Sequence, residues 1–218
     1  MKKKEIIEID HSNEAIDYKE SVNVMEKRII NIYSKRNPEL IWFLNHNNTY
    51  TMGTSANRNE IHRSASIPII TTNRGGKTTY HGPGQRIVYF LINLNKRKKD
   101  IRKFVNLIEK STIEVLKEFD LEAQTFPKRI GIWITKNKGV TLRKEEKIGA
   151  IGLRIKKWIT YHGLSFNLNP NLQYYNHIDP CGLTEYSTTS MEKLGINLSQ
   201  ENFDKIYLKY FLQGLEKF

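Results

Sequence analysis

Residues 73–85 read NRGGKTTYHGPGQ; the apolar stretch IPIITTN runs into them and RIVYFLINL follows. Four glycines give this segment more backbone freedom than a turn needs. Its GGKTT portion is similar to the end of a phosphate-binding loop, but position 71, where that motif requires glycine, holds Thr71. No G-x-G-x-x-G dinucleotide motif opens a helix here. We therefore expect another kind of ligand to lie against this backbone.

The composition is that of an ordinary globular protein, with 39% hydrophobic and 27% charged residues in a chain of 218. We expect one domain over residues 1–218. The N-terminus MKKKEIIEID lacks the apolar stretch of a signal peptide, and no run reaches the roughly 18 apolar residues of a membrane span. These features favour a cytoplasmic protein. A single cysteine and six scattered histidines lead us to expect no internal disulfide, no metal and no other cofactor.

Hydrophobic periodicity predicts helices and strands along the whole chain. A first helix is expected after Ser12, with an apolar side formed by Ala15, Tyr18, Val22, Met25 and Ile29. Two further helices are expected after Asp100 and Ser199, each of which can cap a helix N-terminus. Strands are predicted at residues 39–46, 49–53, 67–73, 86–94, 131–136, 147–155 and 158–168. Because strands outnumber helices, we predict an α+β sheet with helices packed against it.

The lone cysteine, Cys181, lies in the segment DPCGLTEYSTTS. Lone cysteines are usually small buried apolar residues, but a proline before and a glycine after favour exposure on a tight turn. A nucleophilic thiol needs a nearby cation or base, because its ordinary pKa of about 8.5 leaves little thiolate at neutral pH. The candidates are His81, His162 and Lys147, which opens the small-residue run KIGAIG.

Four motifs, RGGKTTYHGPGQ, KIGAIGLRI, YHGLSFNL and DPCG, follow one another in the order of a known family. Together they resemble the lipoyl(octanoyl) transferases over about residues 41–181. The resemblance implies a biotin/lipoate-protein-ligase-like fold with a mixed sheet flanked by helices. It implies a Cys181/Lys147 dyad, in which Cys181 carries the acyl group as a thioester and Lys147 lowers the pKa of the thiol. Ser165 and Phe166 depart from the Ala-Leu usual in the family.

The resemblance also implies three segments that bind the acyl substrate. They are Arg74, Gly75, Gly76, Lys77, Thr78, Thr79, Tyr80 and His81; Ala150, Ile151 and Gly152; and Gly163, Leu164 and Ser165.

The implied reaction moves an octanoyl group from octanoyl-acyl carrier protein to a lysine of an apo lipoyl domain, without ATP. The acceptors would be lipoyl domains of 2-oxoacid dehydrogenase complexes and the glycine cleavage H protein. We expect a monomer that binds neither nucleic acid nor membranes. The net charge of +12 and the basic segment KRKKDIRK, residues 96–103, would suit an acidic carrier protein.

Three alternatives remain open from the sequence. The first is an ATP-dependent lipoate–protein ligase on the same fold, which needs no cysteine. The second is a Cys-His hydrolase that uses His81 or His162. The third is a basic nucleic-acid-binding module, although we find no nucleic-acid-recognition motif.

Overall fold

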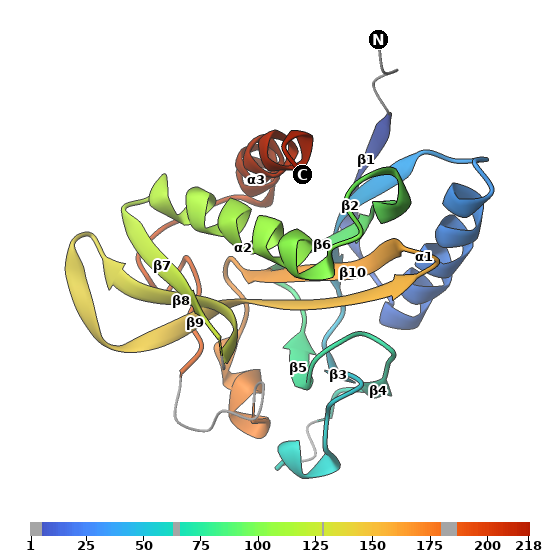
Figure 1. Ribbon diagram of the computed structural model, residues 1–218. Coiled ribbons are helices and arrows are strands. Elements are labelled where there is room, and N and C mark those ends of the chain that lie inside the picture. Colours follow the sequence, from blue (N-terminus) through green and yellow to red (C-terminus); the bar gives the residue numbers. More distant parts are fainter. Residues whose placement is uncertain (1–5, 63–65, 128, 180–186) are drawn as a thin grey trace.

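A seven-stranded mixed sheet forms the centre of the protein (Figure 1). The computed structural model describes residues 6–62, 66–127, 129–179 and 187–218. The strand order is β1-β2-β6-β10-β9-β8-β7. These strands are β1 (Ile7–Ile16), β2 (Glu39–His46), β6 (Gln85–Leu91), β7 (Leu121–Phe126), β8 (Arg129–Asn137), β9 (Val140–Lys156) and β10 (Ile159–Asn167). Strand β1 pairs parallel to β2 and the other neighbours pair antiparallel.

Helix α1 (Tyr18–Tyr33) packs on one face of this sheet. Helices α2 (Ile101–Lys117) and α3 (Gln200–Glu216) pack on the other face. Alternate side chains of a strand point to opposite faces. In β2, Phe43 belongs to the core cluster that includes residues of α2 and α3, whereas its neighbour Trp42 belongs to the cluster that includes Met25 and Ile29 of α1. The fully buried β2 is therefore covered on both sides.

The first helix starts later than predicted. Residues of β1 occupy the positions where the sequence placed its first turn, and α1 begins after Asp17. The carboxylate of Asp17 accepts hydrogen bonds from the backbone N–H groups of Lys19 and Glu20, at 2.8 and 3.1 Å. Ser12, the expected cap, instead accepts a hydrogen bond from Trp42 Nε1 at 2.9 Å. The other predicted caps, Asp100 and Ser199, are confirmed.

A smaller sheet, in the order β4-β3-β5, lies below the large one (Figure 1). Its strands are β3 (Thr49–Met52), β4 (Ile69–Thr71) and β5 (Thr78–His81). The glycine-rich segment is thus a loop, residues 72–77, followed by a strand that the sequence did not predict. The short 3-10 helices η1 (Arg58–Glu60), η2 (Leu94–Lys96) and η3 (Leu172–His177) complete the connections.

Candidate active site

Arg74 shapes the glycine-rich loop from inside. Its guanidinium donates to the Thr51 carbonyl and hydroxyl, at 2.7 and 2.8 Å from Nη2, and to the Lys77 carbonyl at 2.7 Å. Nη1 also donates to the Gly75 carbonyl, at 2.9 Å. The side chain is buried. These bonds tie both ends of the loop to β3, so its conformation is fixed before a ligand arrives.

The loop lies directly on β9. The Gly75 N–H donates to the Leu153 carbonyl at 3.3 Å. A Cβ on Gly75 would lie 2.8 Å from that carbonyl oxygen, and a Cβ on Gly152 would lie 2.9 Å from the Gly75 oxygen. Glycine is needed at both positions because two backbones meet there.

A cavity of about 290 Å³ lies between this loop, β9, β10 and the start of α1. Its lining includes eleven residues predicted to bind substrate: Arg74, Gly76, Lys77, Thr79, His81, Ala150, Ile151, Gly152, Gly163, Leu164 and Ser165. The three segments, which are far apart in the chain, therefore meet around one cavity. Gly76, Gly152 and Gly163 each leave part of the wall without a side chain, so an extended ligand can lie against backbone there.

Three predicted residues do not line the cavity. Gly75 supports the loop on β9. Thr78 is fully buried, and its N–H donates to Glu60 Oε2 at 3.0 Å. Tyr80 stacks on Tyr174 with ring centroids 4.8 Å apart and donates to Asn48 at 2.7 Å. All three hold the walls in place.

Aromatic rings form one part of the lining. The Tyr18 ring stacks against both His81 and His162, with centroids 5.8 and 6.3 Å apart. Burial lowers the pKa of His162 to about 3 and that of His81 well below its ordinary value, so both are neutral at physiological pH. Such weakly basic imidazoles are poor general bases, which argues against the Cys-His hydrolase alternative.

Lys147 lies on β9 at the edge of this cavity. It lines a narrow pocket of about 10 Å³, and three residues, Thr79, Ala150 and Ser165, line both this pocket and the cavity. The side chain is only 6% exposed, in contrast to most lysines. The structure thus places the predicted Lys147 beside the predicted acyl-binding segments.

Cys181 lies outside the described residues. The described chain on either side of it is anchored near the cavity. On one side, the Asp179 N–H donates to the Glu60 carbonyl at 2.8 Å. On the other, the Ser187 carbonyl accepts from the Lys147 N–H at 2.9 Å, and the Thr189 N–H donates to the Lys147 carbonyl at 2.8 Å.

Several lining residues were not predicted as site residues: Tyr18, Ser55, Ile87, Tyr89, Arg129 and Ile130. Tyr18, Ile87 and Tyr89 have the apolar periodicity of ordinary core positions, so nothing in their spacing indicates a second role. Arg129 is held by Glu145 at 3.2 Å and by the Phe126 ring, with its guanidinium carbon 3.8 Å from the ring centroid.

None of the helices in the described ranges has the length and apolar character to cross a membrane.

The fold is shared with a lipoate protein ligase and a biotin protein ligase. A family model described as the lipoyl protein ligase A/B catalytic domain matches residues 17–212. The structure is similar to a bipartite lipoate protein ligase from Thermoplasma acidophilum, with a TM-score of 0.71 and 12% identity over 96% of this chain and 83% of that chain. It is also similar to a mutant biotin protein ligase from Aquifex aeolicus in complex with biotin, with a TM-score of 0.54 and 14% identity over 97% and 71% of the two chains.

Sequence similarity identifies the family more narrowly. An octanoyltransferase from Wolbachia pipientis subsp. Culex pipiens is 47% identical over 201 residues, which are 92% of this chain and 95% of the relative. The chain belongs to the octanoyltransferases, acyl-transferring enzymes within the lipoyl protein ligase A/B catalytic-domain family. The resemblance drawn from its four motifs is confirmed, and so is the predicted α+β fold with a mixed, helix-flanked sheet.

Proposed function

We propose that this protein, acting as one catalytic domain in the cytoplasm, moves an octanoyl group from octanoyl-acyl carrier protein to a lysine of an apo lipoyl domain. The acceptors are the lipoyl domains of 2-oxoacid dehydrogenase complexes and the glycine cleavage H protein. The observation that carries the proposal is the buried Lys147 beside a cavity lined by all three predicted acyl-binding segments. The acyl chain lies in that cavity, between the loop of Arg74–Lys77 and strands β9 and β10.

The first step forms an acyl-enzyme. The Cys181 thiolate attacks the octanoyl carbonyl, a C–S bond to the enzyme forms, and the C–S bond to the carrier breaks. The carrier thiolate leaves and takes up a proton. The ammonium of Lys147 stabilises the attacking thiolate by its charge.

The second step transfers the acyl group to nitrogen. The ε-amine of the acceptor lysine attacks the enzyme thioester, the C–N bond forms, and Cys181 leaves as thiolate while the amine loses a proton. Lys147, which gives its proton to the departing carrier thiolate in the first step, is then a neutral amine that accepts this proton and becomes an ammonium again. An amide is more stable than a thioester, so the step requires no ATP.

Both steps pass through an oxyanion that needs hydrogen-bond donors. The Thr78 N–H is already donated to Glu60 and the Gly75 N–H to Leu153. Of the N–H groups proposed in the glycine-rich segment, those of residues 76–78, this leaves Gly76 and Lys77 as donors, and the N–H groups of Cys181 and Gly182 are the other proposed pair.

Intact mass spectrometry tests the proposal. After incubation with octanoyl-carrier protein and no ATP, the protein should gain one octanoyl group that hydroxylamine removes. Cys181→Ala should gain none. A stable adduct on Cys181→Ala would contradict Cys181 as the nucleophile. A parallel incubation with lipoate and ATP examines the alternative of a lipoate ligase, which the shared fold brings forward; lipoyl-adenylate formation by Cys181→Ala would favour it.

A further inference from the structure

Lys147 lies against the face of an aromatic ring. Strands β8 and β9 place Trp133 directly opposite Lys147, so their side chains share one side of the sheet. The Nζ atom of Lys147 is 5.6 Å from the centroid of the Trp133 ring, within the range of a cation–π interaction. Both residues are buried, at 1% exposure for Trp133 and 6% for Lys147. Exclusion of water strengthens such a contact.

Gly131 provides the space that the lysine side chain occupies. It lies two residues before Trp133 on β8 and therefore on the same side of the sheet. A Cβ at Gly131 would lie 2.5 Å from Lys147 Cε and 3.2 Å from Nζ. Its φ of +135° is a conformation that other residues rarely adopt. The ammonium thus lies between a ring face and the place of an absent side chain.

The Trp133 ring is itself held in place. Its Nε1 donates to the Arg129 carbonyl at 3.2 Å. The Arg129 guanidinium carbon is 4.9 Å from the ring centroid, and this second cation is paired with Glu145 at 3.2 Å. The nearby Glu146 is likewise paired, with Lys193 at 2.8 Å. The ring is therefore a fixed surface for Lys147.

We propose that Gly131 and Trp133 are positioning residues that hold the Lys147 ammonium at one place beside the cavity. The inference rests on the proposed role of Lys147 as the partner of the Cys181 thiolate. A lysine side chain is flexible about its four-carbon stem, so an unsupported ammonium would sample many distances from the reacting sulfur. A fixed one keeps its charge where the thiolate forms, and the protein then needs no reorganisation during the reaction.

Two substitutions at Trp133 separate the effect of the aromatic face from the effect of side-chain volume. Trp133→Phe and Trp133→Leu both remove part of the indole volume, but only phenylalanine keeps an aromatic face. Because Cys181 is the single cysteine, alkylation by iodoacetamide, followed by intact mass between pH 5 and 10, reports this thiol alone. For Trp133→Leu we expect the half-maximal pH to rise and alkylation at pH 7 to slow roughly 3- to 30-fold. Trp133→Phe should stay within about twofold of wild type.

One reference variant isolates the effect: Lys147→Met gives the profile of a protein without the cation. Thermal unfolding establishes that each variant is folded; if Trp133→Leu does not unfold cooperatively, Trp133→Met replaces it.

The outcomes separate this inference from the proposed function. The positioning role is supported if the alkylation profile of Trp133→Leu is displaced toward that of Lys147→Met while the profile of Trp133→Phe matches that of wild type. Identical profiles for Trp133→Leu and Trp133→Phe, while Lys147→Met differs from wild type, would overturn it and leave the dyad standing. A wild-type profile for Lys147→Met would refute the dyad and the positioning role together.

Discussion

Gly75 and Gly152 touch backbone to backbone: a Cβ on Gly152 would lie 2.9 Å from the Gly75 carbonyl oxygen. The glycine-rich loop and strand β9 both line the cavity and meet at this contact, so the contact fixes how these two walls lie against each other. Gly152→Ala must push the two apart or displace the nearby Arg74 stem. We expect it to destabilise the protein by about 1–3 kcal/mol and to raise KM for a small octanoyl thioester several-fold.

Gly139→Ala is the matched control. A Cβ there meets no atom within 4 Å, but the φ of +79° strains alanine, at a cost of roughly 1–2 kcal/mol. This variant should lose stability and keep a wild-type KM. Equal KM values for the two alanine variants would show that contact at Gly152 does not set the cavity.

Buried histidines predict a loss of stability in mild acid. His46 donates from Nδ1 to the Ile16 carbonyl and accepts at Nε2 from the Tyr89 hydroxyl, both at 2.7 Å. Burial lowers the pKa of His46 to about 4. Below its ordinary pKa of 6.5 the unfolded chain binds a proton that the folded protein does not, so stability falls as the pH falls from 6.5 to 4. His46 alone should remove on the order of 2 kcal/mol between pH 7 and pH 5.

Urea unfolding at the two pH values measures this effect. Wild type should lose more than the His46 share, because the pKa values of His81 and His162 are lowered as well. His46→Gln keeps a donor and an acceptor but cannot titrate, so its loss between pH 7 and pH 5 should be smaller by about 2 kcal/mol. A loss equal to that of wild type would show that the pKa of His46 is not lowered in the folded protein.

Local sequence signals were enough for much of the fold. The side chains of the caps Asp100 and Ser199 accept hydrogen bonds from N–H groups in the first turn of their helices. The residue types that can do this are recognisable from the sequence. The start of α1 was missed because Ser12 and Asp17 are both good caps, and only the contact of Ser12 with Trp42 decides between them. The pairing of β1 with a strand 30 residues away likewise depends on tertiary contacts, which local sequence signals do not show.

In the candidate site, too, only the features with a local sequence signal could be predicted. The glycine-rich segment indicates a ligand-binding wall by its sequence alone, because it holds more glycines than a turn requires. Tyr18 could not be found this way, because a buried ring on a helix looks the same whether it faces the core or a cavity. Trp133 was hidden for a similar reason: its relation to Lys147 depends on strand register, which a bulge in β8–β9 shifts at this point.

Glu60 connects the glycine-rich segment to the chain before Cys181. Its carboxylate accepts from the Thr78 N–H at 3.0 Å and pairs with Lys77 at 3.4 Å, while its carbonyl accepts from the Asp179 N–H. Burial alone would raise the pKa of Glu60, but these donors outweigh it and the pKa lies below the ordinary value. The ionised form thus stabilises the fold above about pH 4.5, and this contribution is lost as the pH falls below that value.

Glu60→Ala should therefore cost about 2 kcal/mol at pH 7, because it leaves the buried Thr78 N–H without an acceptor. Glu60→Gln retains a neutral acceptor and should cost less. Chemical unfolding at pH 7 and pH 3.5 checks both statements: the two variants should differ from wild type less at the lower pH. A constant difference across this range would show that ionisation of Glu60 contributes nothing.

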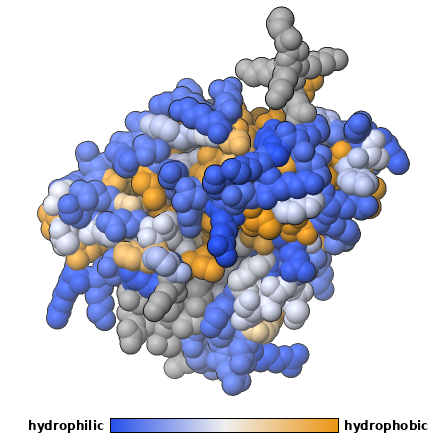
Figure 2. Space-filling model, viewed as in Figure 1, coloured by the Kyte–Doolittle hydropathy of each residue, from blue (hydrophilic) through white to orange (hydrophobic). Residues whose placement is uncertain are grey.

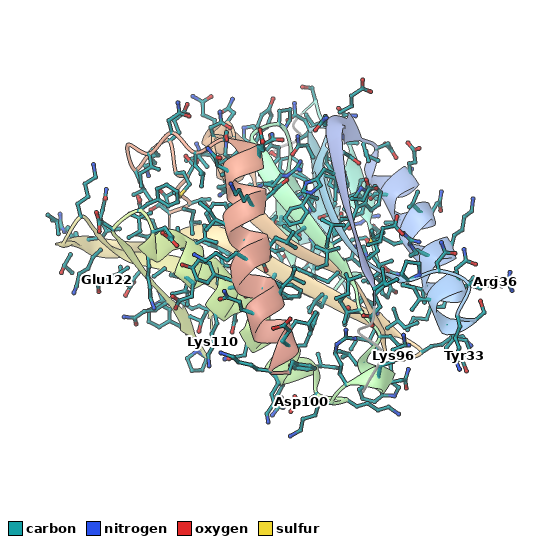
Figure 3. All side chains as sticks on the ribbon, turned by 90° about the horizontal axis from the view of Figure 1, so that it is seen from above. Tyr33, Arg36, Lys96, Asp100, Lys110 and Glu122 are labelled. Carbon is teal, nitrogen blue, oxygen red and sulfur yellow. The ribbon has the colours of Figure 1, made fainter. Side chains whose placement is uncertain are left out.

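Two basic surfaces are candidates for docking the acidic carrier protein of the proposed reaction. The predicted patch, with the exposed Lys98 and Lys99, contacts the turn after β9: Lys99 Nζ lies 5.5 Å from the Trp158 ring centroid. That turn is ten residues from Lys147, or about 33 Å along an extended strand. Figure 3 shows the neighbouring Lys96 at the same end of the molecule as Tyr33 and Arg36, with Glu122 at the other end. Arg97 of the same segment forms an ion pair with the buried Glu39 at 2.6 Å and so stabilises the fold.

The second surface is closer to the proposed chemistry. Arg143 and Lys144 are exposed on β9, and Lys144 is three residues from Lys147, or about 10 Å. Hydrophilic side chains cover much of the molecular surface, with apolar residues visible between them (Figure 2). Because both surfaces carry exposed basic residues, charge alone does not single out one docking site, and distance from Lys147 is the better criterion. We accordingly expect the carrier to dock on the Arg143–Lys144 surface.

Charge reversal at matched positions decides between the two surfaces. Arg143→Glu/Lys144→Glu should lower kcat/KM for octanoyl-carrier protein about tenfold or more at low salt, because steering by a local potential is lost. The deficit should shrink as salt rises, since the Debye length falls from about 10 Å at 0.1 M to about 3 Å at 1 M. Lys98→Glu/Lys99→Glu makes the same change in net charge and should leave kcat/KM within about threefold of wild type. Neither pair should alter the reaction of a small octanoyl thioester, which needs no docking; if the Lys98/Lys99 pair shows the larger, salt-dependent loss, the carrier docks at the distant patch as the sequence alone suggested.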